Sequence, residues 1–345
     1  MNPALLRLAL DSRRLFRLAH LLSRLPLPPG ARVRLARLLG RMFSTQRRER
    51  TKLLLAFRLG LRLDLGSAKK MFGWWKASEG LFAASIFDYS RMDADWVRRH
   101  VAIDQPEVLA RIVREGGLLL TFHTFHHNTL ALTLGQCGIP LFPVAASEKN
   151  SPFAPYTGRY MRIINGESEA KFSGGRYLFT DEMRSVVTGV RTALASRHTV
   201  LALCDNPVPP NESAIPPQEV MGRSISIGTG VMKLVQQAQA PVYFALFYPD
   251  MGGGYRLVLE DAGRLEELEN TARAYFAFLA RHVAAAPWAW QGWSWYADLP
   301  PVPARVEIDA SVKPLILEGI EPSGHPLMRA LDGLRWAARI CLPGR

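Results

Sequence analysis

The sequence predicts an α/β fold in which a mixed, mostly parallel sheet is flanked by helices and follows basic amphipathic helices. Two observations predict the sheet. Short apolar runs bounded by turn residues alternate with helical patterns, as in sheets buried on both faces. In addition, 48% of the 345 residues are hydrophobic, which suffices for a sizeable core. A third observation, the gathering of arginine near the amino terminus, predicts the basic helices.

The first 60 residues carry most of the positive charge. They hold 13 arginines and one lysine against Asp11 and Glu49, a net charge of +12, whereas the whole chain carries +13. A basic segment of this kind usually meets an anionic surface, either a membrane or nucleic acid. Because no motif that reads DNA or RNA is visible, no nucleic-acid partner is predicted.

Leucine is interleaved with arginine throughout this arm. On a helical wheel, five arginines of the first 24 residues fall within one third of the circumference. Much of the opposite side is apolar, and its residues are Leu5, Leu8, Leu15, Phe16, Ala19 and Leu22. The separation is imperfect, since Leu6, Leu10 and Leu21 lie among the arginines. The stretch PLPPG then ends the helix, and a second Arg/Leu helix is predicted over residues 31–42.

Basic amphipathic helices are typical of membrane-surface anchors. Each arginine near anionic lipid contributes about 1 kcal/mol, so several together make a useful anchor. The alternative is an ordinary helix that packs on the body of the protein through its leucines. No segment of the arm has the roughly 20 uninterrupted apolar residues of a spanning helix, and arginines interrupt any apolar region of a signal peptide. A peripheral attachment to an anionic membrane surface is therefore predicted.

The elements after the arm follow in order along the chain. Residues 71–93 form a helical run rich in aromatics, and residues 93–116 predict a short extended segment and an amphipathic helix closed by Gly116. The predicted strands are Gly117 to Phe122, Ile139 to Ala145, Thr199 to Cys204, Val242 to Tyr248 and Tyr255 to Leu259. The predicted helices between them are Asp181 to Ser196, Thr229 to Ala240 and Leu265 to Ala285.

Three parts of the chain are distinguished in this way. Residues 1–60 form the basic arm, and residues 61–299 form the α/β domain. Residues 300–345 form an extension that begins with a proline-rich stretch and ends in an apolar helical pattern. The three cysteines are far apart and odd in number, so neither a disulfide framework nor a zinc site is predicted, and a reducing cytoplasmic setting is favoured.

Two polar clusters follow predicted strands, at the sheet edge where ligands of α/β proteins gather. One is TFHTFHHN, with His123, His126 and His127, and the other is CDNPVPPNES. The histidine spacing of i, i+3 and i+4 also fits a metal site on one helical face. It matches the His-x-x-His-His box of membrane desaturases and hydroxylases. Those enzymes need several boxes and spanning helices, and only one box is present here.

Two other interpretations of these histidines remain. His126 and His127 can be structural residues that pack or form hydrogen bonds in the core. His123 can instead be a general base, because Asn128 follows it by five residues and can reach back to fix the imidazole tautomer. The free ring nitrogen then takes a proton from an attacking hydroxyl or amine.

A strand followed by His-x-x-x-x-Asp/Glu resembles the signature of the lysophospholipid acyltransferase superfamily. The wider order of motifs is similar to its branch of bacterial late acyltransferases of lipid A and related lipids. That branch has an arginine about 30 residues before a strand that ends in aspartate, and Arg176 precedes Asp205 by 29 residues. It also often closes with a tryptophan-rich segment, here APWAWQGWSWY. The resemblance covers roughly residues 50–298.

The resemblance implies a glycerolipid-acyltransferase-like fold that moves an acyl group from acyl carrier protein or acyl-CoA to a hydroxyl or amine of a lipid. It implies the cytoplasmic face of the bacterial inner membrane, with no cofactor and no metal. His123 would be the base and Asn128 its orienting partner. Arg176, or backbone N–H groups from Gly222 to Gly230, would stabilise the oxyanion.

Further roles follow from the same resemblance. Arg176 and Arg223 would clamp a phosphate, and Asp205 would orient Arg176. Counted as catalytic are His123, Asn128, Arg176 and Asp205, and counted as substrate-binding are Arg223, Gly222, His126 and His127.

Asn128 departs from the family pattern, which has an acidic residue at this position. Asparagine can orient an imidazole but cannot stabilise its positive charge, and in serine proteases the change from Asp to Asn costs about 10⁴ in rate. Either the chemistry is less demanding, as with an amine acceptor, or another carboxylate substitutes, or activity is lost. Two alternatives therefore stand beside a lipid acyltransferase: a catalytically weak relative that binds lipid or carrier protein, and an acyltransferase of a soluble secondary metabolite.

Overall fold

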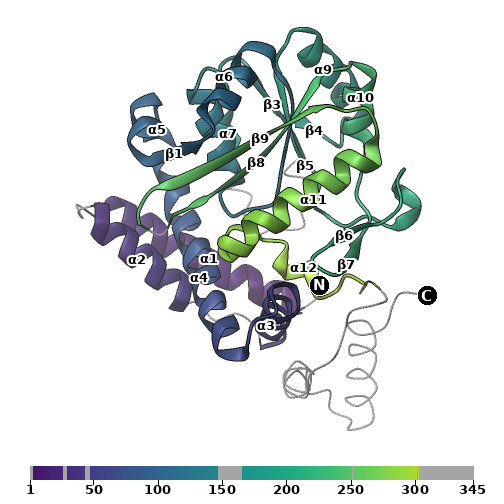
Figure 1. The fold of residues 1–345 in the computed structure, drawn as a ribbon. Helices are drawn as coiled ribbons and strands as arrows, with labels where there is room; N and C mark the ends of the chain where they lie inside the picture. Colours follow the sequence, from purple (N-terminus) through teal and green to yellow (C-terminus); the bar gives the residue numbers. More distant parts are fainter. Residues whose placement is uncertain are drawn as a thin grey trace.

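The structure, a computed structural model, describes residues 3–25, 29–42, 47–146, 165–250, 252–300 and 302. Within them a seven-stranded sheet runs in the order β1-β9-β8-β2-β5-β3-β4 (Figure 1). Its strands are β1 (Val101–Asp104), β2 (Gly117–Thr121), β3 (Leu141–Ala145), β4 (Leu178–Phe179), β5 (Thr199–Leu203), β8 (Pro241–Pro249) and β9 (Tyr255–Arg264). All neighbours are parallel except β8 and β9. The predicted mixed, mostly parallel sheet is confirmed.

All five predicted strands are present, and two short features were not predicted. One is β4, which has two residues. The other is a separate hairpin of β6 (Gln218–Val220) and β7 (Arg223–Ile225). Met221 and Gly222 connect its strands with φ values of 47° and 83°, the left-handed conformation that a two-residue hairpin turn requires. Strands this short carry too little periodicity to be recognised in a sequence.

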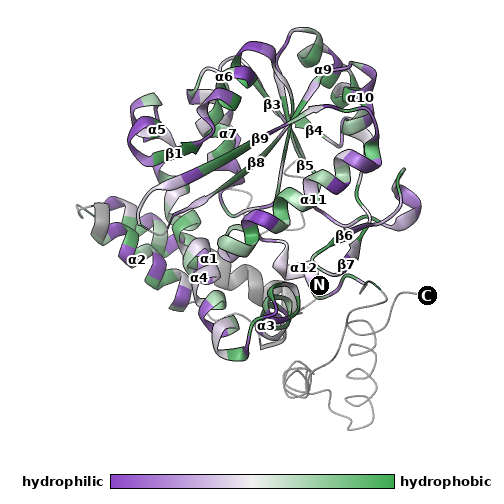
Figure 2. Ribbon diagram, viewed as in Figure 1, coloured by the Kyte–Doolittle hydropathy of each residue, from purple (hydrophilic) through white to green (hydrophobic). Residues whose placement is uncertain are grey.

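Helices cover both faces of the sheet. On one side lie α9 (Met183–Ala195), α10 (Gly230–Gln237) and α11 (Leu268–Ala285), and on the other lie α5 (Ala94–His100), α6 (Pro106–Glu115) and α7 (His127–Gln136). Leu118 and Leu120 of β2 belong to the first of the two resulting clusters, and Leu119 belongs to the second. This two-sided burial explains why Leu118, Leu119 and Leu120 follow one another without a polar residue. Figure 2 shows that the neighbouring strands β5 and β8 are likewise mostly hydrophobic.

The amino-terminal helices α1 (Pro3–Arg24) and α2 (Pro29–Met42) pack against α4 (Leu65–Ser85). Gly40 and Gly80 allow the backbones of α2 and α4 to approach closely: a Cβ atom on Gly40 would lie 2.1 Å from the Lys76 carbonyl oxygen, and one on Gly80 would lie 2.1 Å from that of Ala36. The third helix, α3 (Arg47–Leu61), adds five consecutive buried residues to the main core, Leu53, Leu54, Leu55, Ala56 and Phe57.

The face of α1 that packs is part of the apolar side seen on the helical wheel. Leu15, Ala19 and Leu22 are buried together with residues of α4. Among the side chains that the structure describes on α1, at its end and on α2, other large apolar ones are exposed, namely Leu18, Leu21, Leu25, Leu35, Leu38 and Met42. Exposed arginines lie on the same helices at positions 14, 17, 24, 34 and 41. Among the described residues, no helix is both long and apolar enough to cross a bilayer.

The predicted extension over residues 300–345 falls almost wholly outside the described residues, and its helix stays a prediction. Its first residues run along the hairpin. The Ser224 N–H donates to the Pro300 carbonyl at 2.8 Å, and the Val302 N–H donates to the Gly222 carbonyl at 3.1 Å.

Candidate active site

The register of two central strands brings the two polar clusters together. Strands β2 and β5 are parallel neighbours in which Thr121 is paired with Leu203, the last residue of each strand. His123 and Asp205 each follow two residues later, so they leave the sheet side by side at its carboxyl edge. Such edges collect the functional groups of α/β proteins.

His123 and Asp205 form a tight pair. The imidazole Nδ1 lies 2.7 Å from Oδ1 of Asp205, and the backbone N–H of His123 donates to both carboxylate oxygens at 3.1 and 3.0 Å. The carboxylate is fully buried, whereas the imidazole is 24% exposed. Because a carboxylate accepts, Nδ1 carries the proton and Nε2 keeps its lone pair. The pair therefore has the arrangement of a general base held in the productive tautomer.

The tryptophan-rich segment closes around this pair. Trp290, which is fully buried, donates its indole N–H to Oδ2 of Asp205 at 2.8 Å. The backbone N–H of Gln291 donates to the His123 carbonyl at 2.7 Å. The ring of Trp295 meets the His123 ring nearly at right angles, with centroids 5.8 Å apart. The neutral donor of Trp290 satisfies the second oxygen of a buried carboxylate, which would otherwise be costly to desolvate.

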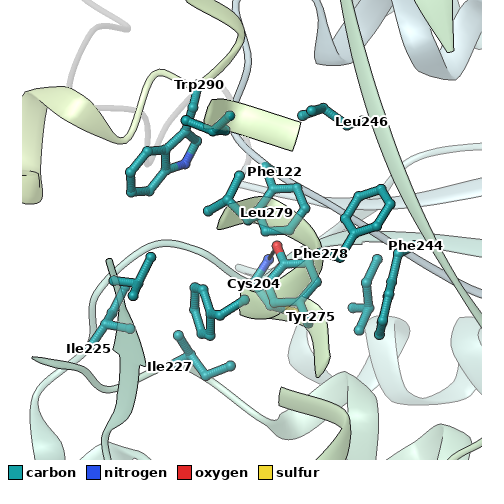
Figure 3. Close-up of a cluster of buried hydrophobic side chains, with 14 of the residues drawn as sticks. Phe122, Cys204, Ile225, Ile227, Phe244, Leu246, Tyr275, Phe278, Leu279 and Trp290 are labelled. Carbon is teal, nitrogen blue, oxygen red and sulfur yellow. Dashed lines mark hydrogen bonds between the residues drawn. The ribbon is translucent and has the colours of Figure 1, made fainter. Parts of the chain in front are cut away.

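Two further contacts support the loops that carry the pair. Trp75 of α4 donates its indole N–H to the Trp290 carbonyl at 3.1 Å, which ties the tryptophan segment to the helical layer. Beneath the site, the Tyr275 hydroxyl donates to the Thr121 carbonyl at the end of β2 and accepts from the Cys204 N–H at 3.4 Å. Figure 3 shows Tyr275, Cys204 and Trp290 within one buried cluster. The ends of both strands are thus held by buried hydrogen bonds.

An amide contacts the second nitrogen of the imidazole. The Asn206 Nδ2 atom lies 3.3 Å from Nε2 of His123, and because Nε2 has the lone pair, the amide is the donor. Asn206 is exposed, unlike its neighbour Asp205. The sequence interpretation missed this residue.

The other two histidines of the cluster have different surroundings. His126 is 1% exposed, and its ring meets Phe82 and Tyr255 edge-on in the core. Burial lowers its pKa to about 3, so it is neutral. The expectation that His126 binds substrate is corrected, because the ring is closed off from solvent. His127 is half-buried, bonds through Nδ1 to the Thr124 carbonyl at 2.5 Å, and lies 5.8 Å from the His123 ring. Burial and the nearby His123 lower its pKa to about 4.

Asn128 does not pair with His123. It lies in the first turn of α7, and within the described residues no hydrogen bond joins its amide to the imidazole. Nδ1 is already bonded to Asp205. The structure thus replaces the expected His123–Asn128 pair with a His123–Asp205 pair, in which the carboxylate comes from another strand.

Arg176 and Asp205 also fail to meet. Arg176 is exposed and lies two residues before β4, whose Leu178 is paired with Val144 of β3. The carboxylate of Asp205 is bonded to His123 and Trp290 instead. The expected orienting contact is therefore corrected.

The hairpin residues proposed for substrate binding have structural roles. Arg223 is 1% exposed, donates to the Leu299 carbonyl at 3.0 Å, and lies over the Tyr296 ring. A guanidinium in this position cannot meet a phosphate from solvent, so the expected clamp is corrected. Gly222 occupies the tight turn and accepts from Val302 through its carbonyl.

A metal site formed by His123, His126 and His127 would require the three imidazoles to converge on one point. In the part of the chain that the structure describes, no three His, Cys, Asp or Glu side chains are arranged to hold a metal ion. Of the His-x-x-His-His box, His123 is bonded to Asp205 and His126 faces aromatic rings, so the three imidazoles do not converge. Cys137 and Cys204 are free thiols, and burial raises the pKa of both.

Comparisons with known proteins add little to this geometry. No protein-family model matches the chain, and no curated protein sequence matches it. Among solved structures, the chain is similar to the 1-acyl-sn-glycerophosphate (LPA) acyltransferase PlsC from Thermotoga maritima, with 12% identity and a TM-score of 0.32 over 68% of this chain and 95% of that chain. At this identity and TM-score, the similarity does not decide the chemistry of the site.

Proposed function

We propose that the protein is an acyltransferase that moves an acyl group from a thioester of acyl carrier protein or CoA to a hydroxyl or amine of a lipid. The observation that supports this proposal most is the His123–Asp205 pair at the carboxyl edge of the sheet. It supplies the general base that the superfamily resemblance requires, in a position where parallel α/β sheets carry their chemistry.

The reaction proceeds by proton transfer and attack on the thioester carbonyl. Nε2 of His123 takes the proton of the acceptor hydroxyl or amine while the acceptor atom bonds to the carbonyl carbon. The carbonyl electron pair moves to oxygen. Collapse of the tetrahedral intermediate breaks the C–S bond, and the leaving thiolate takes the proton back from Nε2. Asp205 stabilises the transient imidazolium, since it is buried and bonded to Nδ1.

The absence of an acidic residue at position 128 no longer favours the alternative of a catalytically weak relative. That alternative depended on the missing carboxylate five residues after His123. Asp205 provides a carboxylate on the same ring nitrogen that Asn128 was expected to contact. The second possibility of the sequence interpretation, that another carboxylate substitutes, is the one the geometry supports.

The proposed site of action is the cytoplasmic face of the bacterial inner membrane, with peripheral attachment through α1 and α2. Support comes from the exposed leucines and Met42 of these helices, which lie beside exposed arginines. Apolar side chains enter the headgroup region while arginines meet anionic lipid. Carrier thioesters are cytoplasmic, so donor and acceptor meet at this face. A lipid A-like acceptor follows from the branch resemblance.

Lipid mass spectrometry of cells tests the proposed function. Cells would carry the native protein, His123→Ala or Asp205→Asn, with His198→Ala as control. His198 lies just before β5, at the other end of that strand, where its ring stacks on Phe142. A lipid that gains a fixed mass with the native and control proteins, and loses it with the two site variants, supports transfer. If no lipid changes with the native protein, the acceptor is not a membrane lipid and the proposal in this form is wrong.

A further inference from the structure

The resting site holds a side-chain amide where the acceptor has to be. A general base and an attacking atom must share a hydrogen bond, with the attacking atom as donor to the base. Nε2 of His123 is the base, and the atom that now donates to it is Nδ2 of Asn206, at 3.3 Å. The attacking oxygen or nitrogen must therefore displace this amide from its present position.

The displaced amide stays close to the reacting carbonyl because its backbone is fixed on both sides. The preceding residue, Asp205, is fully buried. The following residue, Pro207, forms an isolated bridge with Ile227, and the Val208 N–H donates to the Ser226 carbonyl at 2.8 Å. The proline also restricts the backbone of Asn206 to extended conformations. Only rotation of the side chain can move the amide away from Nε2.

The oxyanion of the intermediate forms next to this amide. It is separated from the attacking atom by two bonds, through the former carbonyl carbon. A group that stood in the place of the attacking atom and rotates aside is therefore within reach of the oxyanion. Preorganised N–H donors at this position are usually a large contribution to catalysis of acyl transfer.

We propose that Asn206 is a catalytic residue whose amide N–H caps Nε2 in the resting site and donates to the oxyanion once the acceptor has replaced it. This inference rests on the proposed acyltransferase function. The proton balance is unchanged: Nε2 receives the acceptor proton and returns it to the thiolate, while Asn206 donates a hydrogen bond without giving up a proton. The neutral amide suits both tasks, because a carboxylate at this position would repel the oxyanion.

Thiol release from palmitoyl thioesters of CoA and of acyl carrier protein tests the proposal. The acceptor would be a bacterial inner-membrane lipid extract in detergent, with the native protein, Asn206→Ala, Asn206→Asp and Asn206→Gln. Asn270→Ala is the matched control, since Asn270 is an exposed asparagine of α11. Among the described residues, its side chain bonds to Arg273 of the same helix and to Glu267, the residue before that helix. We expect kcat to fall about 10²- to 10³-fold in Asn206→Ala and Asn206→Asp. KM for the thioester should change less than about threefold, because the oxyanion exists only after attack.

A second measurement examines the resting contact without any turnover. Two-dimensional ¹⁵N–¹H spectra of the histidine rings should show the Nε2 resonance of His123 shifted in Asn206→Ala, while Nδ1 remains protonated. The conservative change Asn206→Gln keeps an amide donor and should recover part of kcat.

The outcomes separate this inference from the proposed function. If the native protein releases thiol and His123→Ala does not, but Asn206→Ala retains more than half of the native kcat, the role of Asn206 is refuted while the function stands. An effect on KM alone would also refute it, since it would place Asn206 in binding only. If the native protein releases no thiol from either donor, the function fails and the inference fails with it.

Discussion

Nδ1 of His123 lies 2.7 Å from Oδ1 of Asp205, across 82 positions of sequence. The contact follows from the pairing of Thr121 with Leu203 at the ends of two neighbouring strands. It makes Asp205, rather than Asn128, the residue that sets the tautomer of the His123 imidazole.

Substitution of the two candidate partners of His123 should give very different results. Asp205→Asn removes the charge that stabilises the imidazolium and disturbs the tautomer, so kcat should fall by up to about 10⁴-fold. Asn128→Ala should change kcat less than about threefold. Thiol-release kinetics, with circular dichroism to check folding, measure both. Equal losses in the two variants would show that the pairing expected from the sequence operates in solution.

Trp290→Phe should slow the reaction without unfolding the protein. The indole of Trp290 donates to Asp205 at 2.8 Å, whereas the equally buried indole of Trp293 donates to the Pro287 carbonyl at 2.7 Å. Both changes to Phe remove one buried hydrogen bond, at a cost of about 1 kcal/mol or more in stability. Only Trp290→Phe should also lower kcat, by roughly tenfold, because it alone removes a hydrogen bond from Asp205. A similar kcat for the two variants would restrict Trp290 to packing.

Buried His126 should make the protein less stable in acid. Its folded pKa of about 3 lies below the ordinary value of 6.5, because burial disfavours the charged form. Between these values the unfolded chain binds more protons than the folded protein, so the free energy of unfolding rises with pH and falls as pH drops from about 6.5 toward 3. The slope is at most about 1.4 kcal/mol per pH unit for one histidine.

Urea unfolding of the native protein and His126→Leu from about pH 7 to pH 5 measures this effect. The other titrating groups are common to both proteins, so the difference in slope isolates His126. We expect a shallower pH dependence in the variant. Parallel curves would mean that His126 is hydrated or accessible to protons in the folded state.

Two glycines of α4 should respond oppositely to alanine. A Cβ atom on Gly80 would meet the Ala36 carbonyl oxygen at 2.1 Å, whereas one on Gly73 would have no atom within 4 Å. Gly80→Ala should lower the free energy of unfolding by about 1–3 kcal/mol, because the backbones of α2 and α4 must separate. Gly73→Ala should raise it by up to about 1 kcal/mol through helix propensity. Chemical unfolding compares the two, and a stabilised Gly80→Ala would contradict the close crossing.

Membrane attachment should depend on the exposed leucines of the arm. The double change Leu21→Glu with Leu38→Glu affects side chains that are 57% and 50% exposed on α1 and α2. Sedimentation with phosphatidylglycerol vesicles should weaken roughly tenfold or more, since each buried leucine contributes about 2 kcal/mol. The matched control is Val113→Glu with Met183→Glu, which alters exposed apolar side chains outside the arm. Equal sedimentation of both double variants would argue against attachment through α1 and α2.

Much of the fold could be predicted because its elements are encoded locally. The strands from Gly117, Thr199 and Val242 are apolar runs closed by turn residues, and the structure places them within one or two residues of the expected bounds. The hairpin at Gly222 and strand β4 escaped detection because each has too few residues to show a period. Which leucines of α1 pack on α4 was also undecided, since a helical wheel shows faces but not neighbours.

Only part of the candidate site could be predicted from the sequence in the same way. His123 and Asp205 were both recognised, each just after a predicted strand, but each was given the wrong partner. The resemblance to His-x-x-x-x-Asp/Glu directed attention to Asn128, which is close in sequence. Asn206 and Trp290 lie in the stretches CDNPVPPNES and APWAWQGWSWY, which were singled out from the sequence. Nothing in those stretches distinguished the two residues from their neighbours.

The sequence by itself determined where the strands begin and end, that both sheet faces are buried, and that positive charge gathers at the amino terminus. These properties depend on residue type and spacing within a few turns of chain. Only the tertiary structure decided that β5 lies beside β2 in a register that aligns position 123 with position 205. The order of strands in a sheet depends on the packing of all helices and strands together, so no local pattern contains it. The pairing of His123 with Asp205 followed from that order.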